Sequence, residues 1–111
     1  MAWARLEDGY FGHPKIVRIW DQEPGAVGLH ARLITYCSKY ETDGFVSRSA
    51  LEMISGVEKD RKIQVEVLLV EGALHEHEDG FVVNDYLDYN YSHEQLEERR
   101  KADRDRKRGK Q

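Results

Sequence analysis

The sequence has few of the features that mark secreted, disulfide-stabilised or membrane proteins. Its 111 residues include one cysteine, Cys37, so an internal disulfide is excluded and a reducing, cytoplasmic location is expected. No apolar run approaches the roughly 20 residues that a membrane span needs, and the N-terminus lacks the apolar segment of a signal peptide. Hydrophobic residues make up 40% of the chain, which is too many for a disordered protein, so one folded domain is expected.

Charge is unevenly distributed along the chain, although the net charge is only −4. Residues 58–91 carry a net charge of −6, whereas residues 99–111 carry a net charge of +6. An acidic body with a basic arm is typical of proteins that bind nucleic acid, because phosphates attract clustered lysines and arginines. A solvated helix end accounts for the same charges equally well, so charge alone leaves both interpretations open.

Two helices are expected in the first half of the chain. Pro14 and Pro24 each fit the first turn of a helix, where the missing N–H would have no partner. In the second helix, apolar residues recur at steps of three and four and form two stripes, which predicts a central helix packed on two sides. The stripes are Ala26, Leu29, Leu33, Tyr36 and Tyr40, and Val27, Ala31, Ile34 and Cys37.

A short strand and a short helix are expected next. Phe45-Val46 favours a strand, and either Ser47 or Ser49 is a suitable N-cap for the helix, in which Ala50, Leu51 and Ile54 face inward. The turn Ser55-Gly56-Val57 ends this helix, because glycine readily adopts turn conformations.

The segment 58–71 fits two kinds of structure, because residues 63–67 alternate strictly between apolar and polar, as in a strand. The length of the segment and its closing Glu71-Gly72 favour a helix, which is our prediction. The expected helix has two apolar stripes, with Lys59, Lys62 and Glu66 in the polar sector between them. These stripes are Val65, Leu68 and Leu69, and Ile63, Val67 and Val70.

The stripe Ile63, Val67 and Val70 needs a partner, because an apolar helix face is stable only when it is covered. The C-terminal helix offers only Leu96 and Ala102 for this purpose. A homodimer through the stripe is therefore expected, and a two-fold dimer would also place two DNA-binding units for a palindromic site.

A hairpin and a polar C-terminal helix complete the chain. Glu78-Asp79-Gly80 between the β-prone runs 73–77 and 81–83 is a strong hairpin signal, whereas residues 85–91 are expected to be irregular. Ser92 and Gln95 have capping-box spacing and open a helix that continues to about Arg108. Ion pairs one turn apart are expected to support it, Glu97 with Lys101 and Asp103 with Lys107.

This order of elements predicts a mostly helical α+β fold with a small β hairpin. It is the order of a winged helix-turn-helix domain, expected at residues 1–91, with a basic C-terminal helix or tail at residues 92–111. In DNA-binding examples, the second helix of the motif enters the major groove, and here that helix is residues 58–71. The hairpin is then the wing.

Several segments carry a family resemblance, and together they span residues 3–108. They are Trp3–Leu6 with Asp8–Phe11, His13–Ile16, Asp43–Val46, Glu71–Leu74 and Asp79–Leu87. In this order they resemble the N-terminal domain of phage and prophage replication-initiation, or replisome-organiser, proteins. The resemblance implies a DNA-binding protein that acts in replication initiation or transcriptional control, with double-stranded DNA and a host or phage replication protein as partners.

Basic residues near the motif and in the arm are the candidate DNA contacts. Lys59 and Lys62 are expected to face the groove, while Arg48 and Arg61 meet phosphates at helix N-termini. The complete set is Arg48, Ser49, Lys59, Arg61, Lys62, Arg99, Arg100, Arg104, Arg106, Lys107 and Arg108. The acidic body and the stripe Ile63, Val67 and Val70 support the alternative, a protein-interaction module on the same fold.

No pattern in the sequence indicates catalysis or a bound cofactor. His75 and His77 lie two residues apart, but two histidines without a cysteine pair or a His-Glu-x-x-His helix do not define a metal site. Cys37 lies within an apolar helix, where a structural thiol is expected rather than a nucleophile. We therefore expect no enzyme activity, no metal and no cofactor.

Overall fold

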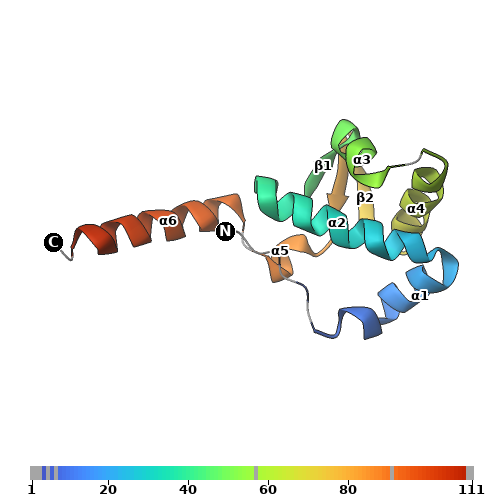
Figure 1. Ribbon diagram of the computed structural model, residues 1–111, viewed down its shortest axis with the longest axis horizontal. Coiled ribbons are helices and arrows are strands. Elements are labelled where there is room, and N and C mark those ends of the chain that lie inside the picture. The colour runs from blue at the N-terminus through green and yellow to red at the C-terminus, as the bar shows by residue number, and fades with distance from the viewer. Residues whose placement is uncertain (1–3, 5, 7, 57, 91, 110–111) are drawn as a thin grey trace.

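The computed structural model describes residues 4, 6, 8–56, 58–90 and 92–109, so the segment 3–6 that contributes to the family resemblance lies largely outside the described residues (Figure 1). Helices dominate, and the strands form one small antiparallel sheet. The elements in chain order are η1 (Tyr10–Gly12), α1 (Pro14–Gln22), α2 (Pro24–Tyr40), β1 (Phe45–Ser47), α3 (Arg48–Ser55), α4 (Glu58–Val70), β2 (Leu74–His77), β3 (Gly80–Val83), α5 (Tyr86–Tyr89) and α6 (His93–Arg108).

The first two helices begin at the predicted prolines. Their N-caps are not the usual serine or aspartate: His13 Nδ1 accepts a hydrogen bond from the Lys15 N–H, and Glu23 accepts one from the Gly25 N–H. Helix α2 lies at the centre of the body and packs against α1, α3 and α4. Most of its two apolar stripes form a wide buried face, as predicted, but Tyr40 at the end of one stripe is 59% exposed.

The sheet has the strand order β1-β3-β2, so β3 is its central strand. The hairpin β2–β3 is confirmed, and β1 pairs with its second strand, with Phe45 opposite Val82 and Ser47 opposite Gly80. At Gly80 the two backbones approach so closely that an added Cβ would lie 2.3 Å from the Val46 carbonyl oxygen. The pairing therefore requires glycine at this position.

Helix α3 begins one residue after β1, and Ser47 caps it. The Ser47 Oγ accepts a hydrogen bond from the Ala50 N–H at 3.1 Å, which leaves Ser49 exposed on the first turn. The alternative cap, Ser49, is therefore wrong. The physical reason is that Ser47, as the last strand residue, already has the extended backbone that an N-cap needs.

The segment 58–71 is helical, as predicted, and α4 ends at Val70. Gly72 then adopts a left-handed backbone with φ of +76°, and the Ala73 N–H donates to the Leu68 carbonyl at 2.8 Å. These features form a glycine-terminated helix end, which overrides the strand-like alternation within the segment.

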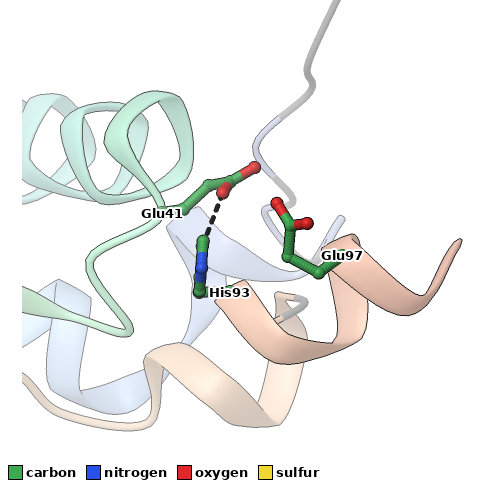
Figure 2. A group of neighbouring side chains, drawn as sticks. All are labelled: Glu41, His93 and Glu97. Atoms are coloured by element: carbon green, nitrogen blue, oxygen red, sulfur yellow. Dashed lines mark hydrogen bonds and ion pairs between the residues drawn. The ribbon is translucent and has the colours of Figure 1, made fainter. Parts of the chain in front are cut away.

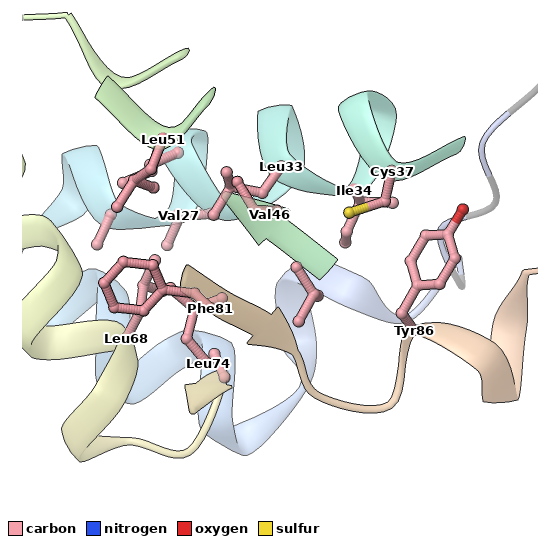
Figure 3. Packing of buried hydrophobic residues seen from close by; sticks show 14 of the residues in the cluster. Val27, Leu33, Ile34, Cys37, Val46, Leu51, Leu68, Leu74, Phe81 and Tyr86 are labelled. Atoms are coloured by element: carbon pink, nitrogen blue, oxygen red, sulfur yellow. The ribbon is translucent and has the colours of Figure 1, made fainter. Parts of the chain in front are cut away.

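One hydrophobic core joins α1, α2, α3, α4 and the sheet (Figure 3). The first α4 stripe belongs to it, since Leu68 is fully buried and Val65 and Leu69 pack against it. The largest of the fully buried side chains are Ile19, Leu29, Leu33, Cys37, Val46, Leu68 and Leu74. Cys37 is thus a buried core thiol, and burial raises its pKa above the usual value.

The C-terminal region differs in part from the expectation. Residues 86–89 form the single helical turn α5 where irregular structure was expected, whereas the capping box of Ser92 and Gln95 is present. The ion pairs expected at a spacing of four are wrong: Arg100 pairs with Glu97 and Arg106 with Asp103, each three residues apart. The forked guanidinium reaches the nearer carboxylate on each turn.

Helix α6 extends from the body at the end opposite α4 (Figure 1). None of its residues is buried, and the longest dimension of the molecule is 57 Å against 30 and 21 Å for the others. Of the helices described here, none combines the length and apolar character that crossing a membrane requires.

Candidate nucleic-acid interface

Helices α3 and α4 are held together by the turn at Ser55 and Gly56. Gly56 has φ of +81°, a conformation that side chains disfavour. Arg61 donates from Nε to the Ser55 Oγ at 2.8 Å and from a terminal nitrogen to the Gly56 carbonyl at 3.1 Å. Arg61 therefore has a structural role in the turn, and a phosphate contact would require these bonds to break.

The outward face of α4 carries both predicted features of this helix. Lys59, Lys62, Ile63, Glu66 and Val70 recur at steps of three and four, so they share one face, and all are exposed. Ile63 is 46% exposed and Val70 is 72% exposed. Val67, the middle residue of the predicted stripe, is instead partly buried and packs against the core, so only Ile63 and Val70 of that stripe share this exposed surface with the predicted DNA contacts.

This overlap changes the expectation for a dimer. Helix α6 projects away from α4, so it does not cover Ile63 or Val70. A dimer through the stripe would, however, bury the face that carries Lys59 and Lys62. Such a dimer cannot present two reading helices to a palindromic site, as the sequence had suggested; it would exclude DNA from both.

We predict that Val70→Glu abolishes any dimer that forms through this face. Val70 is exposed, so folding is not at risk, whereas a carboxylate buried without a partner in the interface opposes association. Light scattering at micromolar concentration measures the mass, with Leu87→Glu on α5, also at an exposed leucine, as the matched control. A monomeric wild type, or a dimer unaffected by Val70→Glu, would contradict self-association through the stripe.

The N-terminal end of α3 adds a further cation next to the sheet. The Arg48 guanidinium lies 5.2 Å from the centre of the Phe81 ring on β3, which positions it by a cation–π contact. The tip of the β2–β3 hairpin is acidic instead, because Glu76, Glu78 and Asp79 are all exposed there. Positive charge is therefore available at α3 and α4 but not on the hairpin.

Helix α6 is attached to the body by a polar cluster that joins it to the end of α2 (Figure 2). Arg100 donates to both Glu41 oxygens, at 2.7 and 3.1 Å, and also contacts Glu97. His93 places Nδ1 2.7 Å from Glu41, and its backbone N–H donates to Asp43. We call Glu41, His93, Glu97 and Arg100 the Glu41 clamp.

The charge distribution in the clamp stabilises ionised Glu41. Hydrogen bonds from Arg100 and His93 lower the pKa of Glu41 to about 2. Glu41, His93 and Glu97 also offer three potential metal ligands within 4.8 Å of one another, with His93 and Glu97 one helical turn apart. Arg100 contacts both carboxylates, so it already supplies the positive charge that a cation would bring.

We predict that Arg100→Gln broadens the range of directions of α6 without lowering the melting temperature. Exposed ion pairs contribute little to stability, but here Arg100 forms a long-range link between α6 and the end of α2, in addition to the contacts of His93 with Glu41 and Asp43. Distances between spin labels at Thr35→Cys and Lys107→Cys measure the effect. Arg106→Gln is the matched control, since its partner Asp103 lies within α6. Equal distance distributions in the two variants would contradict the clamp.

Several basic residues of the arm remain available for a ligand. Within the described part of the chain, no ion pair involves Lys101, Arg104, Lys107 or Arg108, and all are exposed. Arg99 is also exposed. The arm therefore presents cations on a helix that has no contact with the core.

A buried polar pair lies apart from these surfaces. The Tyr10 hydroxyl is 2.7 Å from His30 Nδ1, the two rings are stacked, and His30 is only 8% exposed. Burial, reinforced by the charge of Lys15, lowers the pKa of His30 to about 4. Burial also raises the pKa of Tyr10 to about 12. The pair borders a cavity of about 100 Å³, and no sequence pattern indicates it.

The hairpin histidines were not assigned to a metal site from the sequence. His75 and His77 belong to no group of three potential ligands among the residues that the structure describes. The sequence did not indicate the Glu41 cluster, because Glu41 and His93 are 52 positions apart.

Comparison of the chain with protein-family models, curated proteins and solved structures finds no match. Function is therefore inferred from the surfaces themselves. Of the surfaces described above, the outward face of α4 with the start of α3 and the arm α6 carry accessible cations.

Proposed function

We propose that the chain is a DNA-binding module of the winged helix-turn-helix type. Helices α3 and α4 are the two motif helices, α4 is the recognition helix, and the β2–β3 hairpin is the wing. The observation that carries the proposal is the exposed outward face of α4, with Lys59 and Lys62 in its N-terminal half.

Each exposed group on this face has a matching partner in the major groove. Lys59 and Lys62 can donate to guanine O6 and N7, and Ile63 can contact a thymine methyl group. Arg48, positioned by Phe81, lies at the start of α3, where the helix dipole also favours a phosphate. Specific and electrostatic contacts are thus combined over two adjacent helices.

The hairpin has a different role from that of a basic wing. Phosphates repel Glu76, Glu78 and Asp79, so the tip is expected to remain away from the DNA backbone. The arm α6 supplies the missing cations, since its free lysines and arginines can follow the backbone. This division places base reading on α4 and most of the non-specific affinity on α6.

The resemblance noted in the sequence suggests the setting. A module of this kind fits replication initiation or transcriptional control in a phage or prophage, with double-stranded DNA as its ligand and a host or phage replication protein as a further partner. The acidic hairpin tip and the exposed Ile63 and Val70 on α4 favour the second candidate function, a protein-interaction module on the same fold.

The test is a titration of a fluorescent 20-base-pair duplex at several salt concentrations. Lys59→Gln with Lys62→Gln is expected to weaken binding at least about tenfold, because each lost base contact is worth roughly 1–3 kcal/mol. Arg32→Gln with Lys39→Gln on α2 is the control, since it removes the same charge from exposed positions on another helix. Equal losses in the two double variants would refute α4 as the reading helix, and no binding at low salt would favour the interaction module.

A further inference from the structure

A second surface, which shares no residue with the outward face of α4, lies between α2 and α3. It is an open groove of about 850 Å³. Met53 on α3 is 85% exposed and Tyr40 on α2 is 59% exposed, although both are large apolar side chains. The groove is lined by Ala4, Arg32, Thr35, Tyr36, Ser38, Lys39, Tyr40, Ala50, Met53 and Ile54.

The groove is lined by positively charged side chains, whereas the chain as a whole is negatively charged. Among the residues that the structure describes, the groove lining includes Arg32 and Lys39 but no carboxylate, whereas the chain as a whole has a net charge of −4. Lys39 Nζ lies 5.4 Å from the centre of the Tyr40 ring, so the cation is held beside the apolar floor. A ligand that fits must be apolar on one side and acidic at its edges.

The shape of the groove matches a helix. Its walls are one face of α2, with residues spaced by three and four, and one face of α3. A groove between two packed helices accepts a third helix as a ridge, which is a common mode of peptide recognition. Tyrosine, methionine and arginine are also the residues enriched at protein interfaces, and methionine adapts to varied side chains.

We propose that the α2–α3 groove binds an acidic amphipathic helix of a partner protein. Apolar residues of that helix, one turn apart, pack on Tyr36, Met53 and Ile54, and its flanking carboxylates pair with Arg32 and Lys39. The partner is a protein and not DNA, because the floor is apolar and, of the described lining residues, two are cations. The proposal stands independently of DNA binding by α4.

The probe is a displayed library of random 16-residue peptides, selected on the full-length chain. Peptides that bind wild type are counter-selected on Met53→Glu, a change at an exposed residue that leaves the core intact. The selected peptides are expected to carry net negative charge and apolar residues at helical spacing. Fluorescence anisotropy of one winner is expected to show at least tenfold weaker binding to Met53→Glu and to Arg32→Glu with Lys39→Glu.

Leu87→Glu on α5 is the matched control, because it adds the same charge to an exposed apolar position outside the groove. The proposal is overturned if the selected peptides are basic or lack apolar residues at helical spacing. It is also overturned if they bind Met53→Glu as well as they bind wild type. Loss of a dimer on Met53→Glu would instead assign the groove to a second copy of the chain. Single-stranded DNA displacing the peptide would assign it to nucleic acid, and either result also overturns the proposal.

Discussion

Removal of residues 99–111 is expected to weaken binding to duplex DNA by a factor on the order of 10²–10³ at 0.1 M salt. Lys101, Arg104, Lys107 and Arg108 form no ion pair within the described structure, so they can neutralise about four phosphates. The slope of log K against log salt should then become shallower by about 3.6. The melting temperature should hardly change, because α6 buries no residue.

The truncation also removes Arg100, so a second variant separates charge from attachment. Replacing the four free cations of the arm by glutamine leaves the Glu41 clamp intact and should reproduce most of the loss of affinity. An unchanged salt slope in both variants would contradict a DNA-binding role for the arm. A large fall in melting temperature would contradict the exposed position of α6.

Acidification from pH 7 to pH 4 is expected to lower the free energy of unfolding by roughly 3 kcal/mol through His30 alone. The pKa of His30 falls from 6.5 to about 4 in the folded protein, so the unfolded state binds the proton more tightly. The contribution is therefore fully present above pH 6.5 and is lost progressively as the pH falls toward 4. Tyr10 remains neutral throughout this range, since its pKa is about 12.

Chemical denaturation at a series of pH values measures this effect. In His30→Gln, the stability profile between pH 4 and pH 6.5 should be flatter than in wild type, even if the variant is less stable at pH 7. His77→Gln, at an exposed histidine of the hairpin, is the control and should keep the wild-type slope. Parallel profiles for wild type and His30→Gln would contradict a neutral, buried His30.

The helices were predictable because apolar spacing and end signals agree along the chain. Pro14 and Pro24 start α1 and α2. Gly72 marks the end of α4 as a helix, whereas the strand-like alternation of residues 63–67 alone would have predicted a strand. The hairpin followed from Asp79-Gly80 between β-prone residues. These features are local, so a window of a few residues contains the information that determines them.

The turns were harder to predict because their backbone geometry is unusual for the residue types. Glu41, Asp43 and Asp85 adopt left-handed φ values of 55°, 57° and 62° without being glycine. His13 and Glu23 cap helices although neither is a preferred N-cap. Tertiary contacts select these conformations, so no local sequence pattern predicts them.

The candidate sites also include some features that local sequence spacing predicts and others that depend on tertiary packing. The outward face of α4 was predictable from helical spacing, including the mixture of lysines with Ile63 and Val70. The role of Arg61 in the turn and the bond from Arg100 to Glu41, 59 positions away, depend on how the elements pack. Sequence spacing identifies the charges, but only the fold shows which of them are already paired.

The most direct test of DNA binding by α3, α4 and the arm is an NMR titration of the ¹⁵N-labelled chain with a 20-base-pair duplex. The largest amide shifts are expected at residues 48–49, 58–63 and 99–109, with little change at the acidic hairpin tip, residues 76–79. Saturable shifts in those segments at moderate salt would support α4 as the reading helix and α6 as the phosphate-binding arm. Shifts confined to the hairpin or to the α2–α3 groove, or no shifts at low salt, would contradict it.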